Sequence, residues 1–421
     1  MKGNACVLLS AFAIITVVEC KHPNNVCKTF PDYYTRLTNR HCWYNPDVTA
    51  EAPQLVLSHG YQLELYEVIT EDFYILQVFR IPPKNKNNKG IVFLQHPSLG
   101  SCANWIDLGN VSLAFLLADA GYDVWMGNAR GNKYSNKHVY LSPNSNEYWN
   151  HSFHEMGLYD FPAQFDLVRK QTGYKNKINL ISHSMGATSA FVYASLRPQH
   201  ASENIKLFIC WTPVAYMKET SPIAKIVAPF TNLLMFIVER LNLMNLAPPN
   251  GLMHSILKLL CTKIPWTMEL CVLARGTLGG YNPKSFLPER LPLIIYQNFA
   301  GMSAKAYAHY GQIISAGGRF QFYDYGNKLN RLYYHSVNPP LYPIKNIKIP
   351  MSFMYGQKDI LADEKDVLNF YNKLPIEARY GVKKIDGYVH LDFQYGKDVE
   401  KIVFNCTINI LDQFRSVNST K

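Results

Sequence analysis

The sequence predicts an α/β fold, with a mostly parallel, doubly wound sheet and an inserted cap or lid subdomain. In the first half of the chain, short apolar runs typical of buried strands alternate with runs of helical spacing, as in parallel βαβ units. This alternation then stops and resumes with the apolar run 349–355. We therefore expect residues 214–345 to form a cap between the two parts of one core, 21–213 and 346–421. A length of 421 residues suits such a core with an insertion.

The elements of the core follow from these patterns in chain order. Two β-prone runs, 63–70 and 74–81, flank a Glu71-Asp72 turn and predict an antiparallel hairpin ahead of the main sheet. Further strands are expected at 90–95, 122–126, 178–181, 207–211, 349–355 and 383–385, with helices at 112–120, 152–172, 187–196 and 391–414.

The first twenty residues have the pattern of a secretory signal peptide. Lys2 precedes an apolar run from 5 to 18, and small residues allow cleavage near Cys20. The alternative is an uncleaved anchor helix, but a membrane span needs about 20 apolar residues and this run is shorter. We therefore expect cleavage and delivery to the secretory pathway.

Seven cysteines remain after that cleavage, at 27, 42, 102, 210, 261, 271 and 406. Secretion permits disulfides, and an odd count leaves at least one cysteine unpaired. Cys261 and Cys271 are the favoured pair because they lie close together in a loop-rich segment. Glycosylation sequons begin at Asn110, Asn150, Asn405 and Asn418.

The chain carries a formal net charge of +11 at pH 7. Its basic residues are scattered and no base-stacking module accompanies them, so we expect no nucleic-acid partner. A favourable approach to anionic lipid surfaces is the more useful interpretation.

One run in the expected cap, residues 223–238, can form a wide apolar face on a helix. We favour a helix packed in the core of the cap, and the alternative is a lid surface that meets lipid. Because the run is short and interrupted by proline, we expect that it does not span a membrane. No transmembrane anchor is therefore expected after signal cleavage.

The candidate nucleophile lies in residues 180–188, where an apolar strand stops, Ser184 follows, and a helix-forming run begins at Ala187. This strand, turn and helix have the form of the nucleophile elbow of the α/β-hydrolase fold. The usual pattern is G-x-S-x-G, and here Ser182 stands at the first glycine. As a bare pattern it also fits an ordinary strand-to-helix turn.

A serine nucleophile needs a base, an orienting carboxylate and donors for the oxyanion. Asp359 follows the strand 349–355, and His390 lies in a loop before the final helix, in the Ser, Asp, His order of this fold. The competing acids are Asp363, Asp366 and Asp386, which sit further along a helix or turn.

Backbone N–H groups of Met185 and Ser98 are the expected oxyanion donors. Met185 follows the nucleophile at a helix N-terminus, where the helix dipole favours negative charge. Ser98 lies in the loop after strand 90–95. His183 lies beside the nucleophile, and we expect it to pack structurally and not to act as the base.

Several segments together resemble the gastric and lysosomal acid lipase family, from about residue 45 to residue 411. They include Asn45-Pro46-Asp47-Val48-Thr49, Gly127-Asn128, Arg130-Gly131-Asn132, Phe153-His154-Glu155-Met156, Ala300-Gly301, His309-Tyr310, Leu361-Ala362-Asp363 and His390-Leu391-Asp392-Phe393. The resemblance implies a triad of Ser184, Asp359 and His390 under a cap. It also implies water-insoluble fatty-acid esters as substrates, and neither a cofactor nor a metal.

Three positions depart from the family pattern. Pro97-Ser98 stands where the family usually has Gly-Leu, and proline fixes φ near −65°. If the family's glycine needs another φ, the Ser98 N–H would be mis-aimed. Ser182 replaces the elbow glycine and should add strain, and Phe73 replaces a glycine after Glu71-Asp72 and should alter only a turn.

These features together predict a secreted or lysosomal serine lipase or esterase. It would hydrolyse fatty-acyl esters of neutral lipids, triacylglycerol or sterol ester, at a lipid–water interface through an acyl-enzyme. The alternative, motivated by Pro97 and Ser98, is a catalytically weakened lipase-like protein that binds or carries lipid.

Overall fold

A computed structural model describes residues 5–7, 17–19, 22–84 and 88–419. Within the expected signal peptide, it describes only β1 (Ala5–Val7) and β2 (Val17–Glu19), which pair antiparallel. The expected cleavage position near Cys20 lies outside the described residues.

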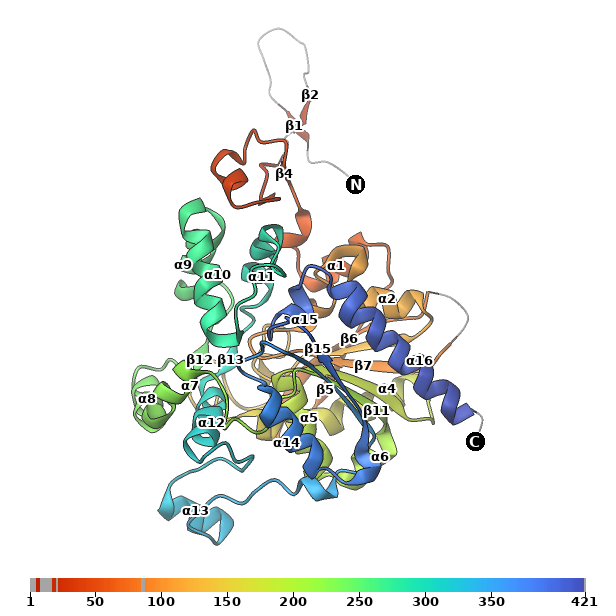
Figure 1. Cartoon of the computed structure of the whole chain (residues 1–421), viewed down its shortest axis with the longest axis vertical. Helices are drawn as coiled ribbons and strands as arrows, with labels where there is room; N and C mark the ends of the chain where they lie inside the picture. The colour runs from red at the N-terminus through yellow and green to blue at the C-terminus, as the bar shows by residue number, and fades with distance from the viewer. Residues whose placement is uncertain (1–4, 8–16, 20–21, 85–87, 420–421) are drawn as a thin grey trace.

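The centre of the molecule is a mixed sheet that has nine strands in the described residues (Figure 1). Its order is β15-β14-β11-β10-β7-β8-β6-β5, and β9 pairs with β6. The strands are β5 (Glu64–Ile69), β6 (Tyr74–Ile81), β7 (Ile91–Gln95), β8 (Asp123–Gly127), β9 (Lys137–His138), β10 (Ile178–His183), β11 (Ile205–Trp211), β14 (Met351–Gly356) and β15 (Arg379–Ile385). Strands β7, β8, β10, β11, β14 and β15 are parallel, and the β5–β6 hairpin and β9 are antiparallel. The predicted fold class is confirmed.

Helices cover both faces of this sheet. One face packs against α4 (Phe161–Thr172), α5 (Met185–Leu196) and α14 (Glu364–Lys373), and the other against α1 (Ala52–Ser58), α2 (Leu113–Asp119) and α16 (Asn405–Ser419). Successive strand residues alternate between the two cores, with Leu180 in the first and Ile181 in the second. The central strands β7, β8, β10 and β14 are therefore buried at every position, as the sequence pattern predicts for a sheet covered on both faces, whereas β5 and β15 at the two edges are partly exposed.

Some elements differ from their expected bounds. The expected helix 152–172 is α3 (Phe153–Glu155), a π-helical turn and α4. The expected closing helix is divided into α15 (Asp392–Tyr395), a π-helical turn and α16. Phe73 has a φ of +70°, so the substitution of the family's glycine leaves a left-handed residue in the β5–β6 turn.

The segment between β11 and β14 contains most of the remaining helices and lies to one side of the sheet (Figure 1). They are α7 (Pro222–Val227), α8 (Thr231–Arg240), α9 (Leu252–Thr262), α10 (Pro265–Gly279), α11 (Leu291–Gln297), α12 (Ala304–Ser315) and α13 (Asn327–Tyr334), with the short strands β12 (Asn245–Leu246) and β13 (Met302–Ser303). The cap limits of 214 and 345 remain a prediction.

The apolar run in this segment is not a core helix. Helices α7 and α8, joined by a 3-10 turn at Ala228–Phe230, form the stretch Pro222–Arg240, and only 17% of its most apolar window is buried. The expectation of a helix packed in the cap core is therefore wrong. With 19 residues and a mean hydropathy of 1.4, the stretch is also long and apolar enough to cross a membrane by length and composition. This finding corrects the expectation on length, whereas the expected interruption by proline is present, because the 3-10 turn between α7 and α8 contains Pro229.

The cysteines form two disulfides in the described residues, Cys27–Cys42 and Cys261–Cys271. The first was not predicted and joins β3 (Val26–Cys27) directly to β4 (Cys42–Trp43). The free cysteines of this part of the chain are Cys102, Cys210 and Cys406.

The glycosylation candidates lie at the surface where the structure describes them. Asn110, Asn150 and Asn405 are exposed, and the side chain of Asn418, in α16, lies outside the described residues. Asn150 Oδ1 accepts a hydrogen bond from Lys305 Nζ at 2.8 Å.

Candidate active site

The turn between β10 and α5 presents Ser184 at the C-terminal edge of the sheet. Its φ of +54° and ψ of −119° lie outside the regions that L-residues prefer, as expected of a nucleophile elbow. The Ser184 N–H donates to Trp211 O at 3.0 Å, which ties the turn to the neighbouring strand β11. At Gly186, a Cβ atom would approach the carbonyl oxygens of Gln95 and His96 to 2.7 Å. Glycine is therefore required where α5 crosses β7.

Ser182, which replaces the other glycine of the motif, fits within β10. It is fully buried, and its Oγ has no hydrogen-bond partner among the described residues. A buried hydroxyl without a partner lowers the free energy of unfolding. Serine in place of glycine at position 182 therefore destabilises the end of β10 locally.

The structure brings the three predicted triad residues together. His390 Nε2 lies 2.7 Å from Ser184 Oγ, and His390 Nδ1 lies 2.8 Å from Asp359 Oδ2. All three residues are buried. Asp359 is itself held in place, because its Oδ1 accepts the N–H groups of Leu361 and Ala362 at 2.9 Å each. This chain of hydrogen bonds is the geometry that activates a serine for attack on a carbonyl.

The competing acids have other partners. Asp363 caps α14 by accepting the Lys365 N–H at 2.8 Å, and Asp366 accepts the Glu219 N–H at 2.7 Å. Asp386 is exposed in the turn after β15.

His183 is fully buried beside the triad, and its Nε2 lies 3.2 Å from the backbone oxygen of His390. Burial lowers the pKa of His183 well below its usual value, so the ring is neutral and Nε2–H can donate to that oxygen. The His183 ring thus contacts the backbone of His390, the predicted base, and lies next to it without contacting Ser184 Oγ in the hydrogen-bond chain.

The loop that carries Ser98 is fixed at three points. His96 Nε2 accepts the Ala129 N–H at 3.0 Å, so His96 carries its proton on Nδ1, which lies 2.7 Å from Pro97 O. Burial lowers the pKa of His96 to about 4, which keeps this tautomer neutral. Leu99 O accepts the Ala300 N–H at 2.9 Å. Because a trans peptide directs its C=O and N–H oppositely, the bond to Pro97 O also fixes the direction of the Ser98 N–H.

Pro97 has the negative φ that its ring imposes, and the effect of this replacement on the aim of the Ser98 N–H stays a prediction. The left-handed residue is Leu99, with a φ of +60°, and Pro97 is not among the residues of positive φ. The second expected donor, Met185, is the first residue of α5, and amides in the first turn of a helix have no intrahelical acceptor.

The inserted segment closes over the site from one side. His390 N–H donates to Gly279 O, at the end of α10, at 3.0 Å, and a Cβ atom on Gly279 would lie 3.2 Å from His390 Cβ. Tyr307, on α12, donates to Ser98 Oγ at 3.4 Å. Sequence reasoning missed these contacts, although the motif Ala300-Gly301 pointed to this part of the insertion. No group of metal-ligating side chains occurs in the part of the chain that the structure describes.

A sheet of this topology, with a serine at the turn between β10 and α5, defines the α/β-hydrolase fold. Family models agree: residues 52–109 match "Partial alpha/beta-hydrolase lipase region" and residues 90–214 match "alpha/beta hydrolase fold". Among solved structures, a putative lipase from Sulfolobus solfataricus has the same fold, with a TM-score of 0.54 at 14% identity over 84% of this chain and 94% of that one.

Curated relatives identify the family. The chain is 38% identical to gastric triacylglycerol lipase of Homo sapiens, over 88% of this chain and 92% of the relative. It is 36% identical to human lipase member K over the same shares, and 34% identical to lipase 1 of Drosophila melanogaster over 87% of this chain and 80% of that one. The chain belongs to the family of the gastric triacylglycerol lipases, which confirms the resemblance in its sequence.

Proposed function

We propose that the chain is a serine lipase that hydrolyses fatty-acyl esters of neutral lipids, triacylglycerol or sterol ester, through an acyl-enzyme. The observation that carries this proposal is the continuous hydrogen-bond chain from Ser184 Oγ through His390 to Asp359. The substrate class is supported by relatives named triacylglycerol lipases.

In the first half of the reaction, Ser184 Oγ attacks the ester carbonyl while His390 Nε2 takes the hydroxyl proton. Asp359 holds the imidazole in the tautomer with a proton on Nδ1 and stabilises its charged form. The N–H groups of Met185 and Ser98 bind the oxyanion of the tetrahedral intermediate. His390 then gives its proton to the leaving alcohol, and the acyl group stays on Ser184.

In the second half, water attacks the acyl-enzyme, with His390 again as the base. The collapse of the second tetrahedral intermediate releases the fatty acid and restores Ser184. These steps need no redox or metal chemistry from the residues named.

The exposed apolar helices of the insertion support a lipid–water interface as the place of action. Large apolar side chains are exposed along α7 and α8, among them Ile226, Phe230, Leu233, Ile237 and Leu241. Contiguous apolar surface of this kind marks protein or membrane contact sites. The chain works as a secreted or lysosomal enzyme, in keeping with its two disulfides.

The decisive measurement compares wild type with Ser184→Ala on long-chain triacylglycerol, cholesteryl ester and a short-chain ester. We expect the variant to lose on the order of 10⁴-fold or more in kcat, and Ser182→Ala to keep the activity. If wild type turns over none of the esters faster than Ser184→Ala, the proposal fails. A fluorophosphonate should label wild type at Ser184, whereas a chain that only binds lipid would remain unlabelled.

A further inference from the structure

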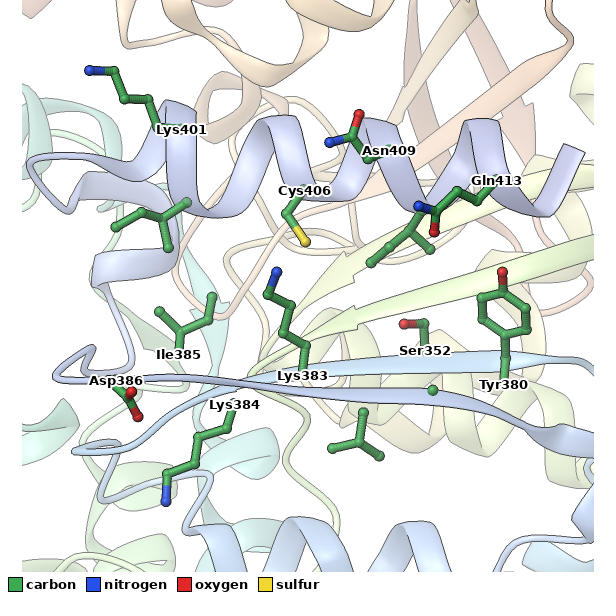
Figure 2. Close-up of a pocket in the computed structure, with 14 residues that line it drawn as sticks. Ser352, Tyr380, Lys383, Lys384, Ile385, Asp386, Lys401, Cys406, Asn409 and Gln413 are labelled. Atoms are coloured by element: carbon green, nitrogen blue, oxygen red, sulfur yellow. The ribbon is translucent and has the colours of Figure 1, made fainter. Parts of the chain in front are cut away.

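A groove of about 790 Å³ lies between the edge strand β15 and the helix α16 (Figure 2). None of the residues that line it belongs to the triad. The lining side chains that the argument uses are Lys383 and Ile385 of β15, Ile402 of the π-helical turn before α16, and Cys406 and Ile410 of α16. The volume is within the range of small-molecule sites, about 300–1,000 Å³.

The sequence of β15 explains why this space is not filled. Among the described residues the strand is paired only with β14. The register shifts at its start, so that Ser352 pairs with Gly381 while Tyr380 is left out of the ladder. Beyond this irregularity, the positions that face α16 hold Gly381, Lys383 and Ile385. Of these, only Ile385 fills the core against the helix, where it is 5% exposed.

A single cation points into the groove. In Figure 2 the ammonium of Lys383 points toward Cys406 on α16, whereas Lys401 and Asn409 point away from the strand. No carboxylate pairs with Lys383 in the described part of the chain, and Asp386, the acid of the lining, lies apart from it at the turn end of β15 (Figure 2). The adjacent Lys384 points to the opposite side of the strand, where it pairs with Glu364 at 2.8 Å.

We propose that this groove binds a long-chain fatty acid, with the carboxylate on Lys383 and the acyl chain against Ile385, Ile402 and Ile410. An unpaired ammonium beside an apolar wall is complementary to an amphiphile with one negative charge. The choice of a fatty acid among such amphiphiles rests on the proposed function, because a lipase releases this product. The groove is then a second product site, apart from Ser184.

The thiol of Cys406 provides a local readout of occupancy. It is partly exposed in the groove, whereas the other free cysteines of the described chain, Cys102 and Cys210, are fully buried. A ligand in the groove should therefore slow the alkylation of Cys406 by N-ethylmaleimide, followed on its own peptide by mass spectrometry. The assay uses the Ser184→Ala protein, so no product is made and the result does not depend on turnover.

We expect oleate to slow this alkylation at least fivefold, and Lys383→Met to remove the protection. Lys384→Met is the matched control and should keep it, and Lys383→Arg should restore it. Methyl oleate, without a charge, and acetate, without an acyl chain, should not protect. Equal protection in Lys383→Met and Lys384→Met, protection by acetate or methyl oleate, or no protection by oleate would each overturn the proposal. A catalytically inactive wild type with intact oleate protection would overturn only the proposed function.

Discussion

At the scale of single residues, the geometry of the proposed triad depends on how His390 is held. Its ring is held through Nδ1 by Asp359, while its backbone N–H donates to Gly279 O and its backbone oxygen lies 3.2 Å from His183 Nε2. These contacts come from three different elements. A small shift of any of them moves Nε2 away from Ser184 Oγ, and such shifts are costly in rate.

Replacement of His183 by phenylalanine tests its part in this support. The substitution keeps a buried ring and removes the donor to His390 O, at a cost of about 1 kcal/mol for the lost hydrogen bond. We expect kcat to fall about fivefold, with KM changed less than twofold, and the melting temperature to change little. Unchanged kcat would show that His183 only fills space. A parallel rise in KM would show a general disturbance of the site.

The oxyanion loop makes a second prediction at this scale. Ser98→Pro removes the backbone N–H that we assign to the oxyanion, and loss of one such donor costs about 10²–10³-fold in kcat. Ser98→Ala is the matched control, because it keeps the N–H and removes only the hydroxyl that contacts Tyr307. We expect Ser98→Ala to stay within about threefold of wild type. A large loss in Ser98→Ala would assign the effect to the side chain.

At the scale of elements, the Cys261–Cys271 disulfide joins α9 to α10, and α10 ends at the glycine that contacts His390. The double variant Cys261→Ser with Cys271→Ser opens a loop of about ten residues, which corresponds to about 2–3 kcal/mol of stability in the loop-entropy model. We expect a lower denaturation midpoint, measured with urea, and Cys406→Ser to leave it unchanged. An unaltered midpoint in the double variant would show that packing alone holds the two helices together.

The elements that the sequence predicted are those with local signals. Strands such as β7 and β10 are apolar on both faces, and Ser184, Asp359 and His390 follow strands in a fixed order, so their meeting at one edge follows from topology. The left-handed φ of Leu99 and the register shift at Tyr380 could not be predicted in this way. They arise from tertiary contacts that no local pattern encodes.

Local sequence patterns also could not predict that the apolar run on α7 and α8 is exposed. An apolar stripe of helical period indicates that one face of a helix meets apolar surroundings. It does not state whether those surroundings are protein or lipid. The pairing of Cys27 with Cys42 was hidden for a related reason, because it depends on the strand register of β3 with β4.

At the scale of the whole molecule, buried ionisable groups determine how stability changes with pH. Burial raises the pKa of Asp107 to about 7, and its Oδ2 accepts from Tyr395 OH at 2.6 Å. The folded state therefore takes up a proton near pH 7, whereas the unfolded chain takes it up near pH 4. The folded state binds more protons between these values, so Asp107 stabilises the fold as the pH decreases from 8 to 5. The buried His96, with its pKa lowered to about 4, acts in the opposite sense below about pH 6.5.

Asp107→Asn separates these contributions, because asparagine keeps an acceptor for Tyr395 OH and cannot titrate. From pH 8 to pH 5, wild type should gain stability relative to the variant, on the order of 2 kcal/mol. The free energies of unfolding, measured with urea at both pH values, give this difference. Parallel curves for the two proteins would show that Asp107 titrates normally.

The exposed apolar helices would orient the enzyme on a lipid surface. They lie on the inserted segment, and this segment contacts the site through Gly279 and Ala300. If α8 faces lipid, polar replacement of two of its exposed side chains, Leu233→Ser with Ile237→Ser, should weaken adsorption to a triacylglycerol emulsion at least tenfold. The two side chains are 57% and 43% exposed, so lipid can bury about half of each, and full burial of an aliphatic side chain contributes about 1.5–3 kcal/mol. Hydrolysis of a dissolved short-chain ester should be unchanged, because neither residue is part of the triad. Ile376→Ser is the matched control, an isoleucine that is 81% exposed outside the insertion. Equal loss of adsorption in both variants would mean that the lipid contact is spread over the surface and that the insertion gives the enzyme no preferred orientation.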